Sequence, residues 1–499
     1  MTITVNGYET LLAAKVESTA GTAIAVGAGD RIDAKSISLS AKYDQGRDED
    51  SLSPTVKKTW LKTTIPNGTI EAYLPYWGVE RLFAILMGGC TASAHPDGHP
   101  LVGVLEFDRD TIAKSLTAAF SLGEGHATAD ILRVLEVCGL RFASAEFSQE
   151  NGAEASASWE FVGKAQTRDS ATNTSTNLDE VTFLDASYPS RPVTFDDVTI
   201  RAAHQDSDTF GSGQNIDASG YTLKIMTGIP TDTAKHLSTN GALLPVQLER
   251  RGCELTLTFL RDDTNSDVFR QYAEDNEKVK ILIDNMSTEG VPGLSVSDSS
   301  PSKDISGSSN SKLKITLTDE VTAETESKEV TLTLTGLTSG ALIAAAIQTA
   351  FRAVTATNSR FQRCWDKLTC DYNSTVSAKY AIGIASNERV SPTVVAASSV
   401  DLAPELKLGT PGSGDEYDAV AYRLMFFIPE IVFAPVPEEV SGGVSEVEFN
   451  GVASTAYGAT APYGFDADDD DHLSTDLDGD ADQDIRIVVV GRVLTSPIA

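Results

Sequence analysis

The carboxylates near the C-terminal end of the sequence are the residues most suited to holding a metal ion. Asp476, Asp478, Asp480 and Asp482 alternate with other residues on both sides of Gly479. Ca²⁺ takes about six to eight oxygen ligands, but an EF-hand loop has glycine at its sixth position and glutamate at its twelfth. Gly479 is only the fourth residue counted from Asp476. The spacing therefore favours a solvated acidic loop, with a structural cation site on the four aspartates as the alternative.

Histidines and catalytic motifs give little support for chemistry. His95 and His99 flank Pro96-Asp97-Gly98, but Pro-Asp-Gly is first of all a turn sequence, so we expect a turn rather than a metal site. The sequence contains no His-Glu-x-x-His, Gly-x-Ser-x-Gly or P-loop motif. We therefore expect no catalytic residues, no cofactor and no enzyme activity. Glycosidase carboxylates need no local motif, so a glycoside-degrading enzyme stays open as a weaker alternative.

The charge balance limits the possible partners. The 499 residues include 71 Asp and Glu against 39 Lys and Arg, which gives a formal net charge of −32. Such a chain repels phosphate, which argues against a protein that reads or wraps DNA. No apolar run is long enough to cross a bilayer as a helix, so we expect no membrane partner. Five cysteines without paired spacing indicate reduced thiols and synthesis in a cytosol.

The elements that position these residues are predicted to be mainly strands. Val, Ile, Thr and aromatic residues alternate with polar ones in short runs, which are broken by Gly, Asn, Asp and Pro. Alternation indicates antiparallel sheets with one buried and one wet face. The clearest strands are expected at residues 35–43, 69–74, 116–120 and 140–147. Apolar residues follow helical spacing at 76–87, 266–274 and 339–354.

Two flexible tracts bracket a self-contained pattern. Gly290-Val291-Pro292-Gly293 opens a polar stretch, and the segment 409–414 is rich in Gly and Pro. The elements predicted between these tracts are strands at 312–318, 329–335 and 378–385 and the helix at 339–354. This pattern indicates a small α+β domain inserted at residues 290–414. The strands on either side, 279–284 and 420–427, would then belong to one interrupted domain.

The rest of the sequence contains a weak internal repeat. In each half, a strand leads through a Gly turn into a second strand that is followed by another Gly, and a strand and a helix come before this hairpin. The matching segments are 140–165 and 429–453. We therefore predict two tandem domains, one at 1–190 and a discontinuous one at 191–289 and 415–499. Chance matching in a β-rich chain is the alternative.

Taken in order, these segments resemble the tail tube proteins of long-tailed phages, a family that shares its fold with type VI secretion tubes. Lys15-x-Glu17 followed by Gly21-Thr22 resembles the opening of the family. Three later segments resemble its strand-plus-helix core, its hairpin with a Val-Gly-Lys corner and its Leu-Pro strand: 68–89, 139–164 and 428–433. The resemblance covers residues 1–288 and 415–499, and the inserted segment resembles phage surface decoration domains.

The resemblance implies a mainly β fold of two tandem β-sandwich domains, each with a flanking helix, whose sheets close into a barrel between subunits. Duplicated members form trimeric rings with pseudo-sixfold symmetry and single-domain members form hexamers, so trimers are expected and hexamers are the alternative. The implied function is structural. Stacked rings form the tail tube of a siphophage virion, through which genome DNA passes during ejection without specific binding. Implied partners are further copies of the chain and the tail tip, tape measure and tail terminator proteins; a contractile sheath stays open.

One loop is expected to connect successive rings. In the family, a long loop at the position of residues 45–54 contacts the next ring. The expected inter-ring contact residues are Gln45, Arg47, Asp48, Glu49 and Asp50. A function of another class is also open, a β-sandwich adhesin or carbohydrate-binding protein of the virion surface, which clusters of exposed aromatic residues would favour.

Overall fold

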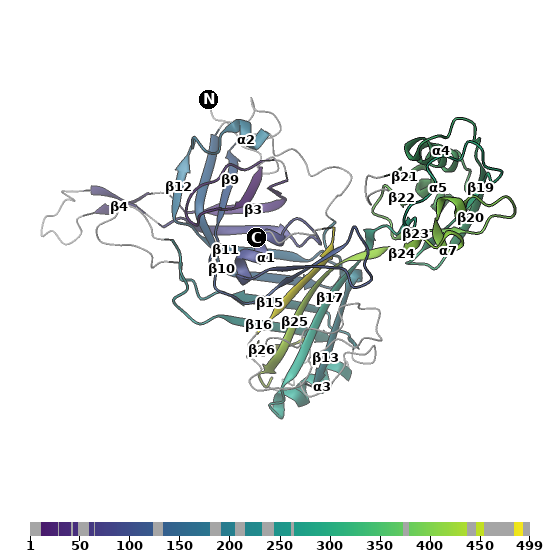
Figure 1. Ribbon diagram of the computed structural model, residues 1–499. Helices are drawn as coiled ribbons and strands as arrows, with labels where there is room; N and C mark the ends of the chain where they lie inside the picture. The colour runs from purple at the N-terminus through teal and green to yellow at the C-terminus, as the bar shows by residue number, and fades with distance from the viewer. Residues whose placement is uncertain are drawn as a thin grey trace, which may run out of the picture.

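The protein is built mainly from antiparallel strands, as the alternating sequence pattern predicts. A computed structural model describes residues 11–27, 29–40, 43–47, 59–63, 65–122, 133–179, 191–204, 215–231, 244–260, 264–372, 379–436, 446–453 and 484–492. Long strands form a central body, and an inserted unit stands apart from it (Figure 1). None of the helices within the described residues has the length and apolar character needed to cross a bilayer.

The first unit comprises residues 12–179. Its strands are β1 Leu12–Val16, β2 Arg31–Ile32, β3 Ala34–Leu39, β4 Tyr43–Arg47, β5 Thr59–Thr63, β6 Asn67–Tyr73, β7 Thr91–Ala94, β8 Gly103–Phe107, β9 Leu116–Leu122, β10 Arg133–Glu150, β11 Ser156–Val162 and β12 Ala165–Arg168. Its helices are α1 Glu80–Met87 and α2 Ser175–Asp179. The strand expected at 140–147 is thus only part of the much longer β10, and the one expected at 35–43 is shorter, since β3 ends at Leu39.

The second unit comprises residues 195–291 and 420–491. Its elements are the 3₁₀ helix η2 Phe195–Asp197, the strands β13 Val198–His204, β14 Asn215–Ile216, β15 Gly220–Met226 and β16 Gly252–Leu260, the helix α3 Thr264–Glu274, and the strands β17 Val279–Val291, β25 Val420–Phe433, β26 Glu446–Ala453 and β27 Arg486–Gly491. The elements β18 to β24 lie in the inserted unit, so β17 and β25 pair side by side although the insertion separates them in sequence.

The two units pair their strands in the same order. In the first unit the pairs are β1–β2, β1–β9, β9–β10, β10–β11, β11–β6, β6–β3 and β10–β12. In the second unit they are β13–β14, β13–β17, β17–β25, β25–β26, β26–β16, β16–β15 and β25–β27. Helix α1 follows β6, just as α3 follows β16. Each strand of the second unit therefore has a counterpart in the first.

A ladder between β10 and β15 connects the units. Residues Ser144–Glu150 of β10 pair antiparallel with Gly220–Met226 of β15, and we call this ladder the internal joint. A second link pairs β8 of the first unit with β27 of the second. Within the described residues the strand pairings form an open, branched series, because no chain of paired strands returns to its starting point.

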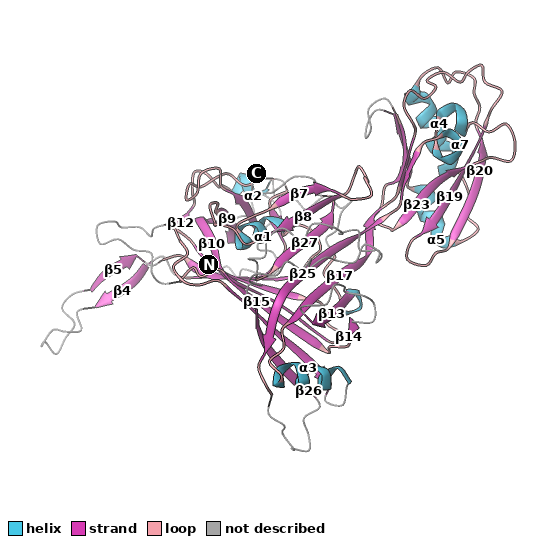
Figure 2. Ribbon diagram, turned by 60° about the horizontal axis from the view of Figure 1, so that its bottom comes forward, coloured by secondary structure: helices cyan, strands magenta, loops and turns pink. Residues whose placement is uncertain are grey.

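Strands β4 and β5 form a hairpin that stands away from the body. They pair with each other from Tyr43↔Thr63 to Arg47↔Thr59, and among the described strands neither has a second partner. Figure 2 shows the hairpin projecting from the side of the body opposite the inserted unit.

Helix α1 lies in a core that both units share. It begins at Glu80 rather than at residue 76, because residues 76–78 form a bend, and it ends at Gly88, whose φ of 93° suits glycine. The Phe83 ring lies 5.3 Å from that of Trp159 and 6.2 Å from that of Phe426 in the second unit. One continuous apolar cluster therefore spans the body.

The inserted unit has its own core. Its elements are β18 Leu294–Val296, β19 Lys312–Asp319, β20 Thr325–Thr331, α4 Gly340–Arg352, α5 Ser359–Asp366, β21 Leu368–Tyr372, β22 Tyr380–Ile384, β23 Val390–Val395, α6 Ala403–Leu406, α7 Gly409–Gly412 and β24 Asp415–Tyr417. Strand β20 begins four residues before the predicted 329–335 and ends at Thr331. Trp365 of the unpredicted α5 stacks on Phe351, with the ring centroids 5.6 Å apart. This apolar cluster is separate from that of the body.

Truncating Phe83 tests the shared core. Because four aromatic rings surround it and it is fully buried, Phe83→Ala should lower the free energy of unfolding by about 3–5 kcal/mol. Leu342→Ala is the control, since Leu342 is 49% exposed on α4. Urea unfolding followed by tryptophan fluorescence measures both variants. An equal loss from the two substitutions would contradict a core centred on α1.

Candidate functional site: a polar sheet face and the joint between the units

The residues predicted from motifs lie mostly outside the described part of the chain. Asp476, Asp478, Asp480 and Asp482 fall there, and so do Asp48, Glu49 and Asp50. Gln45 and Arg47 are described, but they lie in strand β4 and not in a loop as expected. The expected loop conformation was wrong for these two residues, because their backbones pair with Leu61 and Thr59; their contact with a neighbouring ring stays a prediction.

A mainly polar face extends over seven paired strands, with Val452 and Leu260 as exposed apolar residues at its far end. The strands, in order of pairing, are β3, β6, β11, β10, β15, β16 and β26. One row of directly paired residues crosses all seven: Ser36, Glu71, Ser158, Glu146, Lys224, Glu254 and Val452. Neighbouring rows carry further Ser, Thr, Glu and Asn side chains. We call this surface the polar face; it continues across the internal joint from one unit to the other.

Hydroxyl groups on the polar face form hydrogen bonds between neighbouring strands. Ser36 donates to Glu71 at 2.6 Å and Ser144 donates to Glu160 at 2.9 Å. Thr256 donates to the Asn450 side-chain oxygen at 2.6 Å. Such cross-strand pairs stabilise a sheet by roughly 0.2–1 kcal/mol each. The polar face is therefore an ordered surface of short polar side chains.

The polar face is strongly acidic. Its carboxylates are Glu71, Glu146, Glu150, Glu160, Glu254, Glu446 and Glu448. Lys224 is the basic residue in the same paired rows, and Lys35 lies beside them at a bulge of β3. A surface with this excess of negative charge repels phosphate groups. The polar face presents neither a buried nucleophile nor a base beside one.

The opposite side of the same strands is apolar. Phe147, Trp159 and Leu223 are fully buried there, as are Leu255 and Phe449. Strict alternation of these residues with Ser, Thr and Glu places one set in the core and the other on the polar face. The sequence pattern that predicted the strands thus also separates the two faces.

Ion pairs reinforce the second link between the units. Arg109, just after β8, contacts both carboxylate oxygens of Asp484 at 2.9 and 3.1 Å. In the other direction, Arg486 of β27 donates to Asp108 at 2.7 Å. Paired Arg and carboxylate groups with this geometry are stronger than neutral hydrogen bonds. The two units of one chain are therefore firmly connected.

A buried carboxylate organises the corner of the first unit. Glu17 has no exposed surface, and its oxygens accept hydrogen bonds from the backbone of Gly21 at 2.6 Å and Gly139 at 2.7 Å. The hydroxyls of Ser115 and Thr117 also donate to it. Gly139 has a φ of 65°, and a Cβ there would lie 2.6 Å from Lys164. The residues that carried the family resemblance, Lys-x-Glu and Val-Gly-Lys, thus meet at one structural point.

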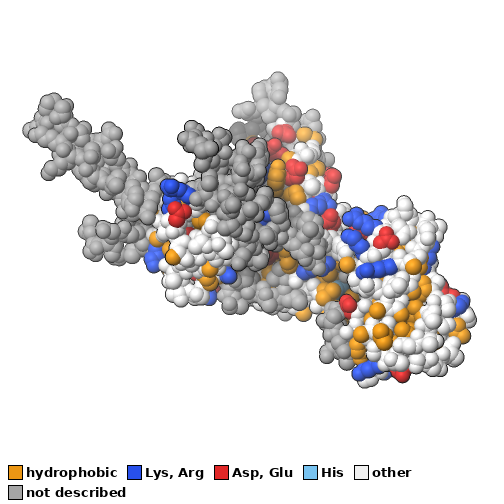
Figure 3. Space-filling model, turned by 90° about the horizontal axis from the view of Figure 1, so that it is seen from above, with side chains coloured by type: hydrophobic (Ala, Val, Ile, Leu, Met, Phe, Trp, Pro, Cys, Tyr) orange, Lys and Arg blue, Asp and Glu red, His pale blue; other side chains and the backbone are white. Residues whose placement is uncertain are grey.

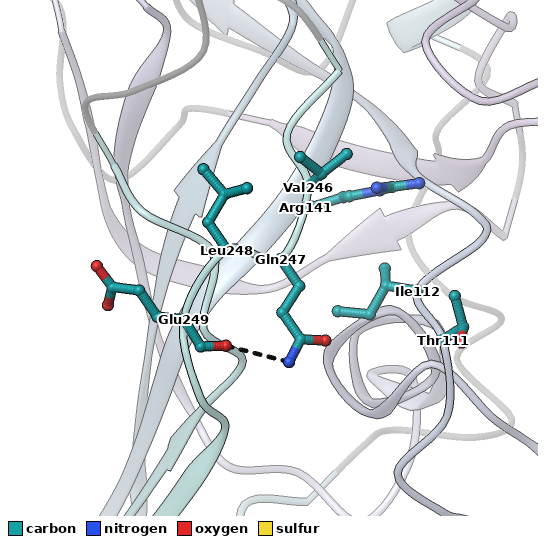
Figure 4. A pocket seen from close by; sticks show the side chains of 7 residues that line it. All are labelled: Thr111, Ile112, Arg141, Val246, Gln247, Leu248 and Glu249. Atoms are coloured by element: carbon teal, nitrogen blue, oxygen red, sulfur yellow. Dashed lines mark hydrogen bonds between the residues drawn. The ribbon is translucent and has the colours of Figure 1, made fainter.

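A recess of about 510 Å³ lies where the two units touch. Its lining residues are Thr111, Ile112, Arg141, Val246, Gln247, Leu248 and Glu249 (Figure 4). Arg141 lies against the second unit, because its guanidinium donates to the carbonyl of Pro245. No paired acid and base lie among the lining residues, so the recess is a seam between units and carries no evident chemistry.

The two histidines singled out by spacing lie beneath the inserted unit. His95 and His99 are both buried, and the ring of His99 lies 5.5 Å from that of Tyr417. Burial lowers the pKa of His99 to about 4, which keeps it neutral at ordinary pH. Within the described residues, no three His, Cys, Asp or Glu side chains gather as metal ligands would.

The inserted unit differs from the body in charge. Residues 290–414 include 12 Asp and Glu and 11 Lys and Arg, a formal charge of −1, so the rest of the chain carries −31. Lys, Arg and apolar side chains are prominent on the face of the inserted unit that Figure 3 shows. The net negative charge of the sequence therefore lies almost entirely outside residues 290–414.

Comparison with known proteins gives no family for the chain. No protein-family model matches it, and no curated protein matches it. The polar face, the internal joint and the repeated pairing order are therefore the features of the molecule that bear on its function.

Replacing the buried carboxylate tests its role in the first unit. Glu17→Gln turns an amide donor toward groups that are themselves donors, so the free energy of unfolding should fall by about 2 kcal/mol. Glu71→Gln is the matched control, because Glu71 is exposed on the polar face and should change stability little. Urea unfolding measures both. A Glu17→Gln variant as stable as Glu71→Gln would contradict the role given to Glu17.

Proposed function

We propose that the chain is a structural subunit that forms stacked rings of a phage tail tube, through which genome DNA passes. The observation that carries this proposal is the repeated pairing order, in which one unit joins the next through the β10–β15 ladder. The family resemblance of the sequence points to the same function. The proposal makes the protein a virion component without catalytic residues or cofactor.

The internal joint supplies the geometry for a ring. In it, the late half of β10 pairs with β15, which is the counterpart of β3. The complementary edges lie at the two ends of the chain. In the described residues, β3 pairs on one side only, with β6, and β25 has no partner beyond Ile431 on the edge that it shares with β17. A second copy could therefore join through the same kind of ladder, and a head-to-tail contact repeated in this way closes into a ring.

The polar face is suited to line the channel of such a ring. It crosses the internal joint without a break, so further joints would extend it around the ring. Its carboxylates repel DNA phosphates, and it presents few basic groups that would hold them. The wall would thus let DNA slide. The apolar opposite face is already covered by α1 and the shared core.

The adhesin alternative receives less support from the described residues. Glycan-binding surfaces commonly present aromatic rings, and Tyr73 is the aromatic member among the large exposed apolar side chains. It lies under Lys35, whose Nζ is 4.0 Å from the ring centroid. We therefore place the tube subunit first and expect copies of the same chain as its main partners.

Electron microscopy of the purified protein tests the proposal. At high protein concentration with a crowding agent, we expect hollow rings and short tubes in negative stain. Light scattering on the same sample should give a ring mass three times the 53.0 kDa of one chain, because each chain supplies two units. Rings of six chains would be consistent with the proposed function but would reject the trimeric ring in which each chain supplies two units. Solid particles without a channel, or glycan binding by a persistent monomer, would contradict the proposal.

Removing charge from the β4–β5 hairpin tests its role in stacking. Asp48, Glu49 and Asp50 directly follow β4 in the sequence, and the hairpin of β4 and β5 projects from the body. Neutralising all three as Asn, Gln and Asn should leave rings intact and lower the yield of stacked tubes several-fold. The control neutralises three exposed carboxylates of the inserted unit, Asp304, Glu324 and Asp371. Tubes equally long in both variants, measured in micrographs, would reject the hairpin as an inter-ring contact.

A further inference from the structure

The two edges that would join separate copies differ from the edges that meet inside the chain. The internal joint pairs seven residues on each strand without a shift in register. Strand β15 opens with Gly220, where a Cβ would lie 2.9 Å from the carbonyl oxygen of Gln149. The two backbones thus approach closely along the full ladder, and the segment 144–150 contains no proline.

Strand β3 carries a bulge in its pairing with β6. Ala34 pairs with Ala72 and Ser36 with Glu71, so Lys35 is an extra residue in the strand. Lys35 is exposed, and its Nζ lies 4.0 Å from the ring centroid of Tyr73 on β6, which ties the bulge to the neighbouring strand. A bulge bends and twists a strand, and lysine at a sheet edge opposes pairing with another strand.

A proline follows β25, which ends at Phe433. The amide of Ala434 donates to Asn450 of β26 at 2.8 Å. A ladder between copies that continued β25 past Ala434 would reach Pro435 next, and proline has no backbone hydrogen to donate to such a ladder. Ala434 and Pro435 are both exposed. Proline is found in sheets chiefly at edges of this kind.

The same two edges are complementary in the pairing order of the units. In the first unit, β9 first pairs with β10 at Leu116↔Leu140, and the internal joint occupies the same edge from Ser144 onward. In the second unit, β17 first pairs with β25 at Val279↔Ile431, and residues 432–436 follow. The bulge and the proline therefore lie where the ladder between copies would form.

We propose that Lys35 and Pro435 restrict edge pairing between copies, so that the ladder between chains is shorter and weaker than the internal joint. This inference rests on the proposed function, since it takes the partner at both edges to be a second copy of the chain. The chain then stays monomeric when dilute and joins only at high concentration or on a preformed ring. Within one chain the two units are joined irrespective of concentration.

The restriction can be removed without disturbing the body. Deleting Lys35 makes Ala34 and Ser36 consecutive opposite Ala72 and Glu71, which straightens β3 and keeps the rest of its register. Pro435→Ala supplies a backbone amide just beyond the end of β25. Lys35→Ala removes the charge but keeps the bulge. Pro404→Ala, at an exposed position of α6 in the inserted unit, is the control for loss of a proline elsewhere.

The critical concentration for assembly, measured by light scattering with negative-stain images, tests the proposal. Deletion of Lys35 combined with Pro435→Ala should lower it at least tenfold relative to the unaltered protein and to Pro404→Ala. Circular dichroism and urea unfolding check that each monomer is folded. If the wild type forms tubes and the variants have the same critical concentration, the proposed restriction by Lys35 and Pro435 is wrong, while the proposed tube function stands. A failure of the wild type and every folded variant to form rings would overturn both proposals.

Discussion

Backbone hydrogen bonding along the edges of β10 and β25 determines how the rest of the chain is arranged. The early half of β10 lies between β9 and β12, and its late half lies between β11 and β15. Every amide on such a strand needs a partner, because an unpaired buried amide costs about as much as a lost hydrogen bond. The buried Glu17 fixes the point, at Gly139, where the strand passes from one set of neighbours to the other. In the second unit β25 repeats this arrangement, but among the described strands none pairs beyond Ile431 on the edge that β17 occupies.

A feature of the fold could be predicted from the sequence where it depends on residues that are close together in the chain. Alternation is local, so it located most strands, and helical spacing located α1, α3 and α4. The length of β10 depends on partner strands that are distant in the sequence. The pairing of Gln45 with Leu61 depends on a strand, β5, that no alternating pattern in the sequence predicted. The predicted strand at 329–335 began four residues too late. Apolar and polar residues alternate there about as well as they do in the observed β20, Thr325–Thr331. The polar face could not be predicted, since only the pairing register brings Glu146, Lys224 and Glu254 into one row.

The chemical character of the surfaces follows from their places in the fold. Acidic and hydroxyl side chains line the strand face that the units share, while the inserted unit is almost neutral. A channel that passes DNA requires repulsion on its wall, and a projecting unit does not. In the proposed ring, the bulge at Lys35 and the missing amide at Pro435 slow association between copies, whereas the internal joint is permanent. Assembly would then respond to concentration and to preformed rings.

Hydrogen–deuterium exchange before and after assembly tests the central claim most directly. If copies join through the outer edges of β3 and β25, peptides covering residues 34–39 and 432–436 should gain protection when rings form. Peptides of the internal joint, such as 220–226, should be protected equally in the monomer and in the ring. Assembled particles in which 34–39 and 432–436 exchange as fast as in the monomer would contradict ring formation through these edges.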